Sequence, residues 1–211
     1  MKSWAVVVPS NRPEQLRTFR KAWAPLLQDY EAELIVVHDN ERGWETLPWF
    51  VPRQTDMIRS AGLIQAFHAK PDYVLTVDDD TAPVPKTDLF AAYEDAFDRG
   101  WPLDTYLSVG SLTDSGREMR GFPYRRRFYR AGIQYGGWHG IPDYDAQTQL
   151  HGAPVAVKFH PAVVPVPRWT AVTGPAMNCA WRTELTPLLW QLPVFEGRYR
   201  RFGDIWSGLL A

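Results

Sequence analysis

The sequence of 211 residues has a single cysteine, almost no net charge and no long uninterrupted apolar run. The lone cysteine, Cys179, excludes an internal disulfide framework and is typical of a reducing compartment. The formal net charge of −1 gives no electrostatic reason to expect a nucleic acid or a membrane surface as a partner. No apolar stretch has the length of a bilayer span or the character of a signal-peptide core. These absences predict a cytoplasmic protein with no membrane span.

The composition is that of an ordinary globular domain. Hydrophobic residues make up 45% of the chain and charged residues 22%, which excludes a disordered protein. The length suits one domain with a full core. Ten tryptophans are many for this length. Indole rings stack well on sugars and bases, so we expect some of them to line a groove, while most fill the core.

Short apolar runs alternate with helical patterns through the first half of the chain. This alternation predicts buried strands at residues 4–8, 34–37 and 74–77, helices at 14–28, 56–70 and 89–97, and a further strand at 106–109. Two strands joined by a helix form a parallel pair with a right-handed crossover. The predicted fold class is therefore α/β, with a mostly parallel sheet and flanking helices.

The strand predicted at 74–77 runs directly into Asp78, Asp79 and Asp80. Three adjacent carboxylates repel one another, and burying them without a counter-charge is costly. The conflict disappears if the strand ends at Val77 and the carboxylates face Mg²⁺ or Mn²⁺, which prefer carboxylate oxygens and share their shell with phosphates. Ligands of open α/β sheets bind at the carboxyl ends of the strands, so we predict a metal–diphosphate site at this edge. The alternative is a solvated acidic turn.

Other polar residues are predicted to reach the same edge of the sheet. Asp39 closes the second strand and can accept a hydrogen bond from a base or a ribose hydroxyl, although aspartate there is also common in turns. Arg59 lies on the first turns of the next helix, and it either points at phosphate or base or is a solvated helix residue. We expect nucleotide binding from these two residues, from Asp79, and from Pro9 and Arg12, which follow the first strand.

Periodicity is poor between residues 110 and 168, where glycine, proline, aromatics and arginine dominate. A long irregular stretch inside a compact domain is usually either functional or a sign of misassignment. The basic cluster that contains Arg127 is either a solvated face or a group that neutralises a diphosphate leaving group. Asp143 and Asp145 lie two residues apart beside aromatics, which suits hydrogen bonds to sugar hydroxyls or a second set of metal ligands.

Two helices are predicted after this irregular stretch. The first begins near residue 174 and runs to Trp190. The second is short, covers 201–206 and carries Asp204 beside an indole.

Several motifs resemble the plant family of reversibly glycosylated polypeptides, whose members are UDP-arabinopyranose mutases. The motifs are Arg-Gly-Phe-Pro-Tyr at 120–124, Trp-His-Gly-Ile-Pro-Asp-Tyr-Asp-Ala-Gln-Thr-Gln-Leu at 138–150, and the segments 174–180 and 201–208. The run at 141–150 is long enough to be specific, and the likeness extends from Val6 to Gly208. The strand-terminal triple aspartate also resembles the metal site of GT-A nucleotide-sugar enzymes.

The resemblance implies a single GT-A-like domain over 1–211, with a nucleotide-binding half at 1–109 and a sugar or acceptor half at 110–211. It implies a UDP-sugar substrate, with UDP-arabinose expected, and Mn²⁺ or Mg²⁺ held by Asp78 and Asp80. It further implies an isomerase that transfers the sugar reversibly onto Arg127, and self-association into a homo-oligomer.

Arginine is an awkward nucleophile, because a pKa above about 12 keeps it protonated. Asp143, Asp145 or Asp204 is therefore expected to accept a proton as the bond to Arg127 forms. The chain departs from the family pattern in the basic neighbours of this arginine and in Gly203-Asp204, where the family has two acids. These departures bear on the sugar and the net reaction more than on the fold. The alternative functions are a metal-dependent glycosyltransferase with an external acceptor and a nucleotide-sugar binding protein without turnover.

Overall fold

The computed structural model describes residues 2–39, 47–53, 55, 57–102, 128–137, 139–140, 146–152, 155–156, 165–166 and 176–191. Its elements are β1 (Trp4–Ser10), α1 (Pro13–Asp29), β2 (Glu33–His38), α2 (Ile58–Ala69), β3 (Tyr73–Val77), α3 (Leu89–Asp98), β4 (Gly100–Pro102), β5 (Phe128–Arg130), β6 (Ile133–Tyr135), α4 (Ala146–His151), β7 (Asn178–Arg182) and the 3-10 helix η3 (Thr183–Leu189). None of the helices in these ranges is long and apolar enough to cross a bilayer.

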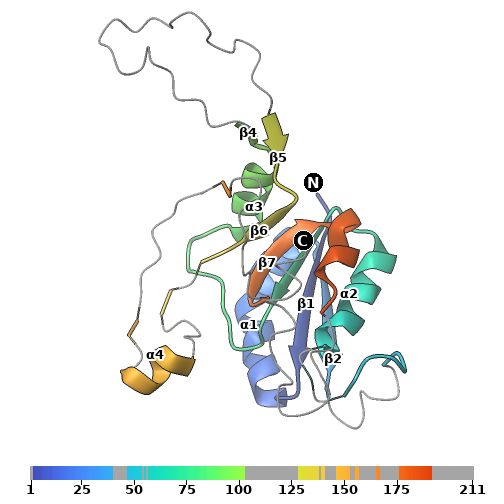
Figure 1. Cartoon of the computed structure of the whole chain (residues 1–211), viewed down its shortest axis with the longest axis vertical. Coiled ribbons are helices and arrows are strands. Elements are labelled where there is room, and N and C mark those ends of the chain that lie inside the picture. Colours follow the sequence, from blue (N-terminus) through green and yellow to red (C-terminus); the bar gives the residue numbers. More distant parts are fainter. Residues whose placement is uncertain are drawn as a thin grey trace, which may run out of the picture.

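A five-stranded mixed sheet with the order β2-β1-β3-β7-β6 organises this part of the chain (Figure 1). β1 pairs in parallel with β2 on one side and with β3 on the other. β7 is antiparallel to both of its neighbours, β3 and β6. A separate two-stranded sheet joins β4 and β5. The main sheet confirms the predicted α/β class and is consistent with a GT-A-like domain.

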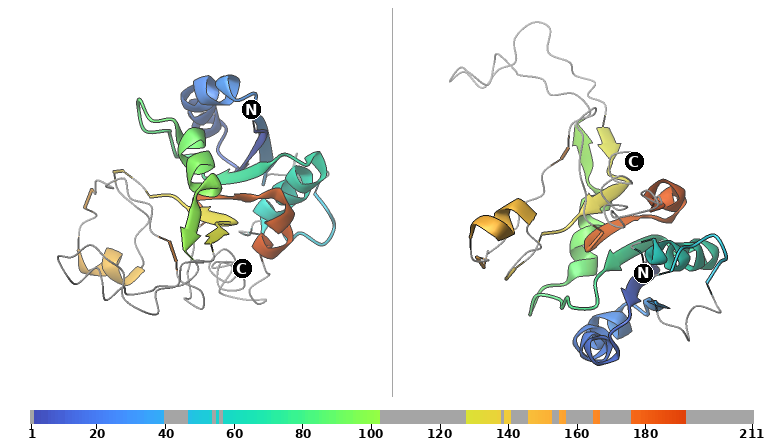
Figure 2. Two further views of the ribbon diagram at one scale, coloured as in Figure 1. Left: turned by 90° about the horizontal axis from the view of Figure 1, so that it is seen from above. Right: turned by 60° about the horizontal axis from the view of Figure 1, so that its bottom comes forward.

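Alternate side chains of β1 divide the core between the two faces of the sheet. Trp4, Val6 and Val8 pack with apolar residues of α1 and α3. Ala5 and Val7 face the other way and pack with α2, β7 and η3. This follows from the two-residue period of a strand, which sends successive side chains to opposite faces. Figure 2 shows α1 and α3 on one side of the sheet and α2 with η3 on the other.

Close contact between α2 and the sheet depends on Gly62. A Cβ at this position would lie 2.5 Å from Cγ1 of Val7 and 2.7 Å from Cγ2 of Val37, which is closer than carbon atoms pack. The glycine therefore lets the helix lie directly on β1 and β2. The first residues of α2 are held in this way next to the carboxyl end of β2.

The structure confirms the early elements and corrects the later ones. The strands predicted at 4–8, 34–37 and 74–77 and the helices predicted at 14–28, 56–70 and 89–97 are all present, with ends shifted by one or two residues. The strand predicted at 106–109 and the helix at 201–206 lie outside the described residues.

The helix predicted from 174 to 190 is wrong. Residues 178–182 form β7, and within the described range 176–191 only residues 183–189 are helical, as the 3-10 helix η3. The strand lies between β3 and β6, and its residues Cys179, Ala180 and Trp181 are buried because helices pack on both faces of the sheet. A short run that is buried on both faces shows no alternation, so its period does not distinguish strand from helix.

The irregular region predicted from 110 to 168 also contains regular structure. β5, β6 and α4 fall within it, and β6 is an edge strand of the main sheet. Both strands have three residues, which is too short for a hydrophobic period to be recognised. Of the tryptophans that the structure describes, Trp4, Trp23 and Trp181 fill the core as expected, whereas Trp49 is 94% exposed.

Candidate functional site

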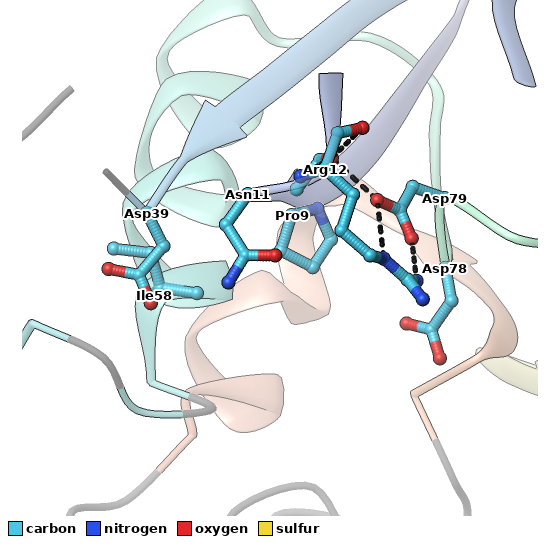
Figure 3. A pocket seen from close by; sticks show the side chains of 8 residues that line it. Pro9, Asn11, Arg12, Asp39, Ile58, Asp78 and Asp79 are labelled. Carbon is cyan, nitrogen blue, oxygen red and sulfur yellow. Dashed lines mark hydrogen bonds and ion pairs between the residues drawn. The ribbon is translucent and has the colours of Figure 1, made fainter. Parts of the chain in front are cut away.

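A cavity of about 400 Å³ lies at the carboxyl ends of β1, β2 and β3. Because the three strands are parallel, the residues that follow each of them meet at this edge. The chain segment after β1 passes between Asp39, which follows β2, and the aspartates that follow β3 (Figure 3). The lining residues are Pro9, Ser10, Asn11, Arg12, Asp39, Ile58, Asp78 and Asp79.

The middle aspartate, Asp79, is buried and hydrogen-bonded on both carboxylate oxygens. Its side chain is only 3% exposed. Oδ2 accepts the hydroxyl of Ser10 at 2.5 Å and Nε of Arg12 at 3.3 Å, and Oδ1 accepts Nη2 of Arg12. A buried carboxylate is tolerated when it is paired with a cation and hydrogen-bonded. Asp79 is therefore a structural anchor for the segment that follows β1.

Arg12 connects the buried Asp79 to the exposed Asp80. Its Nη2 also lies 3.1 Å from Oδ2 of Asp80, whose side chain is 53% exposed. The hydrogen bond to Asp79 is the largest of the effects that raise the pKa of Arg12, and the contacts with Asp80 act in the same direction. The guanidinium consequently stays charged, and in Figure 3 it lies against the carboxylate of Asp79 with Asp78 close by.

The first aspartate, Asp78, forms an ion pair with a different arginine, Arg59. Nη2 of Arg59 lies 2.5 Å from Oδ1 of Asp78, and the Arg59 side chain is only 10% exposed. Nη1 of the same guanidinium donates to the hydroxyl of Thr76 and, at 2.9 Å, to the carbonyl oxygen of Ala176. Arg59 thus ties the start of α2 to the end of β3 and to the segment that leads into β7.

The turn that carries the aspartates is held from two directions. Thr81 closes it, since its backbone N–H and its hydroxyl both donate to the carbonyl oxygen of Asp78, at 3.2 and 2.8 Å. The indole N–H of the buried Trp23 donates to the carbonyl oxygen of Thr81 at 3.1 Å. A core residue of α1 therefore fixes the position of the aspartates at the end of β3.

The two ends of the cavity differ in chemistry. At one end Asp39 lies beside the apolar side chain of Ile58, with the carboxamide of Asn11 between this end and Arg12 (Figure 3). At the other end are the charged groups Arg12, Asp78 and Asp79. An apolar wall with hydrogen-bonding groups suits a flat heterocycle, and a charged end suits phosphate, alone or with a cation.

The carboxylates fit a cation whose shell is completed by a ligand rather than an all-protein metal cage. Within the described ranges, no group of three or more His, Cys, Asp or Glu side chains is arranged to hold a metal ion. Asp78 and Asp80 each use one oxygen for an arginine, and among the described residues nothing donates to the other oxygen. Two carboxylates with substrate phosphates and water make a sufficient shell for Mg²⁺ or Mn²⁺.

Most of the predicted nucleotide and metal residues come together here. Pro9, Arg12, Asp39, Asp78 and Asp79 line the cavity. Asp80 adjoins it through its contact with Arg12, and Arg59 through its ion pair with Asp78. The predicted catalytic residues Arg127, Asp143, Asp145 and Asp204 lie outside the described part of the chain.

Sequence reasoning missed three lining residues. Ser10 and Asn11 come shortly after the strand predicted at 4–8, so the reason for selecting their neighbours Pro9 and Arg12 applies to them as well. Ile58 carried no signal, because an aliphatic residue at the start of a helix is ordinary.

Comparisons with known proteins relate the chain to nucleotide-sugar mutases by sequence similarity. Residues 55–211 match the family model described as reversibly glycosylated polypeptide. The chain is 27% identical to UDP-arabinopyranose mutase 1 of Arabidopsis thaliana, over 96% of this chain and 64% of that protein. It is also 27% identical to UDP-arabinopyranose mutase 1 of Oryza sativa subsp. japonica, over 96% of this chain and 62% of that protein. A probable UDP-arabinopyranose mutase 1 of Pisum sativum is 30% identical over 66% of this chain and 41% of its own length. The chain spans less than two thirds of the length of these curated relatives.

Proposed function

The chain belongs to the reversibly glycosylated polypeptide family, and we propose that it is a UDP-sugar mutase that interconverts pyranose and furanose forms of UDP-arabinose. The observation that carries the proposal is the cavity that gathers Asp39, Arg12 and Asp78 at one sheet edge. Its relatives named UDP-arabinopyranose mutase supply the substrate class. The proposal includes a cytoplasmic setting and self-association, as expected from the sequence.

The nucleotide lies along the cavity from β2 to β3. Uracil and ribose occupy the end near Asp39, where a carboxylate accepts an N–H or a hydroxyl and Ile58 offers an apolar contact. The diphosphate lies at the other end, beside Arg12 and the aspartates that follow β3. Guanidinium is the side chain best suited to phosphate, because its N–H groups form a planar fork.

Asp78 and Asp80 hold the divalent cation in this proposal. The support is their two carboxylate oxygens that accept nothing from the described residues. A divalent cation bound there supplies Lewis-acid stabilisation of the negative charge on the departing UDP. Arg12 and Arg59 keep the two carboxylates in place when the nucleotide is absent.

Sugar transfer in this proposal uses the chain itself as the acceptor. The bond between the anomeric carbon and the β-phosphate oxygen breaks, and UDP leaves with the bonding electrons. A guanidinium nitrogen of Arg127 bonds to the anomeric carbon, and its proton passes to Asp143, Asp145 or Asp204. The sugar ring opens and closes in the other size. UDP then displaces the arginine, which takes its proton back from the acid. The support is the likeness of the segments that carry these residues to the family.

Incubation of the purified chain with UDP-arabinopyranose and Mn²⁺ or Mg²⁺, followed by chromatography of the products, tests the proposal. We expect UDP-arabinofuranose to form without any added acceptor. Sugar that appears only on an added acceptor would make the protein a glycosyltransferase. UDP binding with no product of either kind would make it a nucleotide-sugar binding protein.

A further inference from the structure

The guanidinium of Arg12 is held firmly, but some of its N–H groups have no acceptor among the described residues. Of its five N–H groups, the one on Nε and one on Nη2 go to Asp79, and the second on Nη2 faces Asp80. Among the described residues, nothing accepts the two N–H groups on Nη1. Arg12 lines the cavity and its side chain is 54% exposed. The guanidinium therefore has a free edge with two donors beside the cavity.

The two carboxylates that contact Arg12 differ in how firmly they hold it. Asp79 makes a two-point contact and is 3% exposed, whereas Asp80 makes one contact at 3.1 Å and is 53% exposed. An exposed single contact is weak and screened by salt. A phosphate that enters the cavity can therefore replace Asp80 on Nη2, while Asp79 retains its hold on the other side of the guanidinium.

Ser10 completes the support of the arginine. Its hydroxyl donates to Oδ2 of Asp79 at 2.5 Å, and its oxygen accepts the backbone N–H of Arg12 at 3.2 Å. Asp79 thus orients the side chain of Arg12 directly and its backbone through Ser10. Arginine has many rotamers in solution, so a guanidinium fixed before the ligand arrives loses less conformational entropy on binding.

We propose that Asp79 is a positioning residue that presents the free Nη1 edge of Arg12 to the phosphates of a nucleoside diphosphate and does not itself touch the ligand. This assignment rests on the proposed function and replaces the nucleotide contact expected for Asp79 from the sequence. Both oxygens of Asp79 are already occupied by Ser10 and Arg12, which leaves little capacity for a ribose hydroxyl.

Calorimetric titration with UDP, uridine and inorganic pyrophosphate at a fixed Mg²⁺ concentration tests the assignment. Arg12→Ala should lower UDP affinity at least about tenfold, the loss expected for charge-assisted hydrogen bonds, and leave uridine affinity unchanged. Asp79→Asn should produce the same pattern, because the amide no longer accepts both N–H groups of the fork. The double variant should bind UDP no worse than Arg12→Ala, since Asp79 acts only through Arg12.

Arg17→Lys is the matched control. Arg17 lies on α1 and pairs with the exposed Glu14 at 2.9 Å, so its replacement should leave the affinity for all three probes unchanged. If Asp79→Asn does not give a folded protein by circular dichroism, Ser10→Ala carries the test. It leaves the ion pair in place but releases its support, so it should lower UDP affinity and spare uridine.

The outcomes separate this assignment from the proposed function. UDP affinity that falls in Arg12→Ala and stays at the wild-type value in Asp79→Asn overturns the positioning role and leaves the function standing. Equal losses for UDP and uridine in Asp79→Asn overturn it too, because they show a direct nucleoside contact. If the wild type binds pyrophosphate but does not prefer UDP, and both variants lose pyrophosphate, the positioning role stands and the proposed function fails. A wild type that binds no probe overturns both.

Discussion

Arg59 in α2 and Asp78 after β3 form an ion pair of 2.5 Å next to the cavity, and the arginine is almost completely buried. Together with the contacts of Arg12 to Asp79 and Asp80, this pair supplies positive charge to each of the three aspartates. The sequence argument assigned that role to a divalent cation. In the proposed function, a divalent cation would share Asp78 and Asp80 with these two arginines and would depend on the phosphates of the ligand for the rest of its shell.

Nucleotide binding is expected to depend on the divalent cation. UDP affinity measured by calorimetry should fall when Mn²⁺ and Mg²⁺ are removed with a chelator, because the diphosphate would then face Asp78 and Asp80 without a bridging charge. Asp80→Asn should weaken UDP binding in the presence of the metal. Asp88→Asn is a suitable control, since Asp88 caps α3. Full UDP affinity in excess chelator would contradict the metal assignment.

The base should be selected by the end of the cavity that holds Asp39. We expect UDP to bind more tightly than ADP or GDP, because the carboxylate of Asp39 accepts the N–H of uracil. Asp39→Ala should reduce the difference by about 1.5–3 kcal/mol, the contribution of a hydrogen bond to a charged group. Competition titrations with the three nucleotides measure the difference. Equal affinities in the wild type would count against the assignment of this pocket.

Covalent labelling tests Arg127 as the sugar acceptor. A radiolabelled UDP-sugar should label the protein, and excess unlabelled UDP should remove the label. Arg127→Lys keeps the charge but loses the planar guanidinium, so it should abolish labelling and leave UDP binding largely intact.

Arg125 and Arg126 precede Arg127 in the same basic cluster and are not proposed as sugar acceptors. Arg125→Lys and Arg126→Lys are therefore the matched controls for that experiment and should retain labelling. Loss of labelling in Arg126→Lys instead of Arg127→Lys would shift the assignment by one residue. A wild type that never labels, while sugar appears on an added acceptor, would refute self-glycosylation.

Gly62→Ala should destabilise the fold. The new Cβ would meet two buried valines that are stiff because they are β-branched. Overpacking costs about 1–3 kcal/mol, and the better helix propensity of alanine offsets about 1 kcal/mol of it, so a net loss of about 1 kcal/mol is expected in urea unfolding. Gly152→Ala is the control, since a Cβ there meets nothing within 4 Å. A Gly62→Ala protein as stable as the wild type would show that α2 can shift on the sheet.

Tyr30 should make stability depend on pH in the alkaline range. Burial, followed by the hydrogen bond to Asp88, raises the pKa of Tyr30 from 10.0 to about 12. The folded state therefore retains the phenol proton longer than the unfolded state, and the contribution of Tyr30 to stability is present below pH 10 and lost as the pH rises towards 12. Tyr30→Phe should flatten the fall in unfolding free energy over that range. An identical pH profile in the variant would contradict the raised pKa.

The sequence by itself determined the first half of the sheet and the place of the site. The apolar runs at 4–8, 34–37 and 74–77 are sufficient to predict buried strands. The polar residues that follow these runs meet at one edge of the sheet because the strands are parallel. This local information was enough to place Pro9, Arg12, Asp39, Asp78 and Asp79 around one cavity.

Only the tertiary structure decided which groups are paired. Arg12 meets Asp79 across 67 residues of chain, and a hydrophobic pattern carries no information about the partner of a charged side chain. The same limit applies to residues 178–182, whose buried side chains pack with α1 and α3 on one face of the sheet and with α2 and η3 on the other. The apolar residues 179–181 are too few to show a period of their own, so pairing with β3 and β6 made this segment a strand rather than a helix.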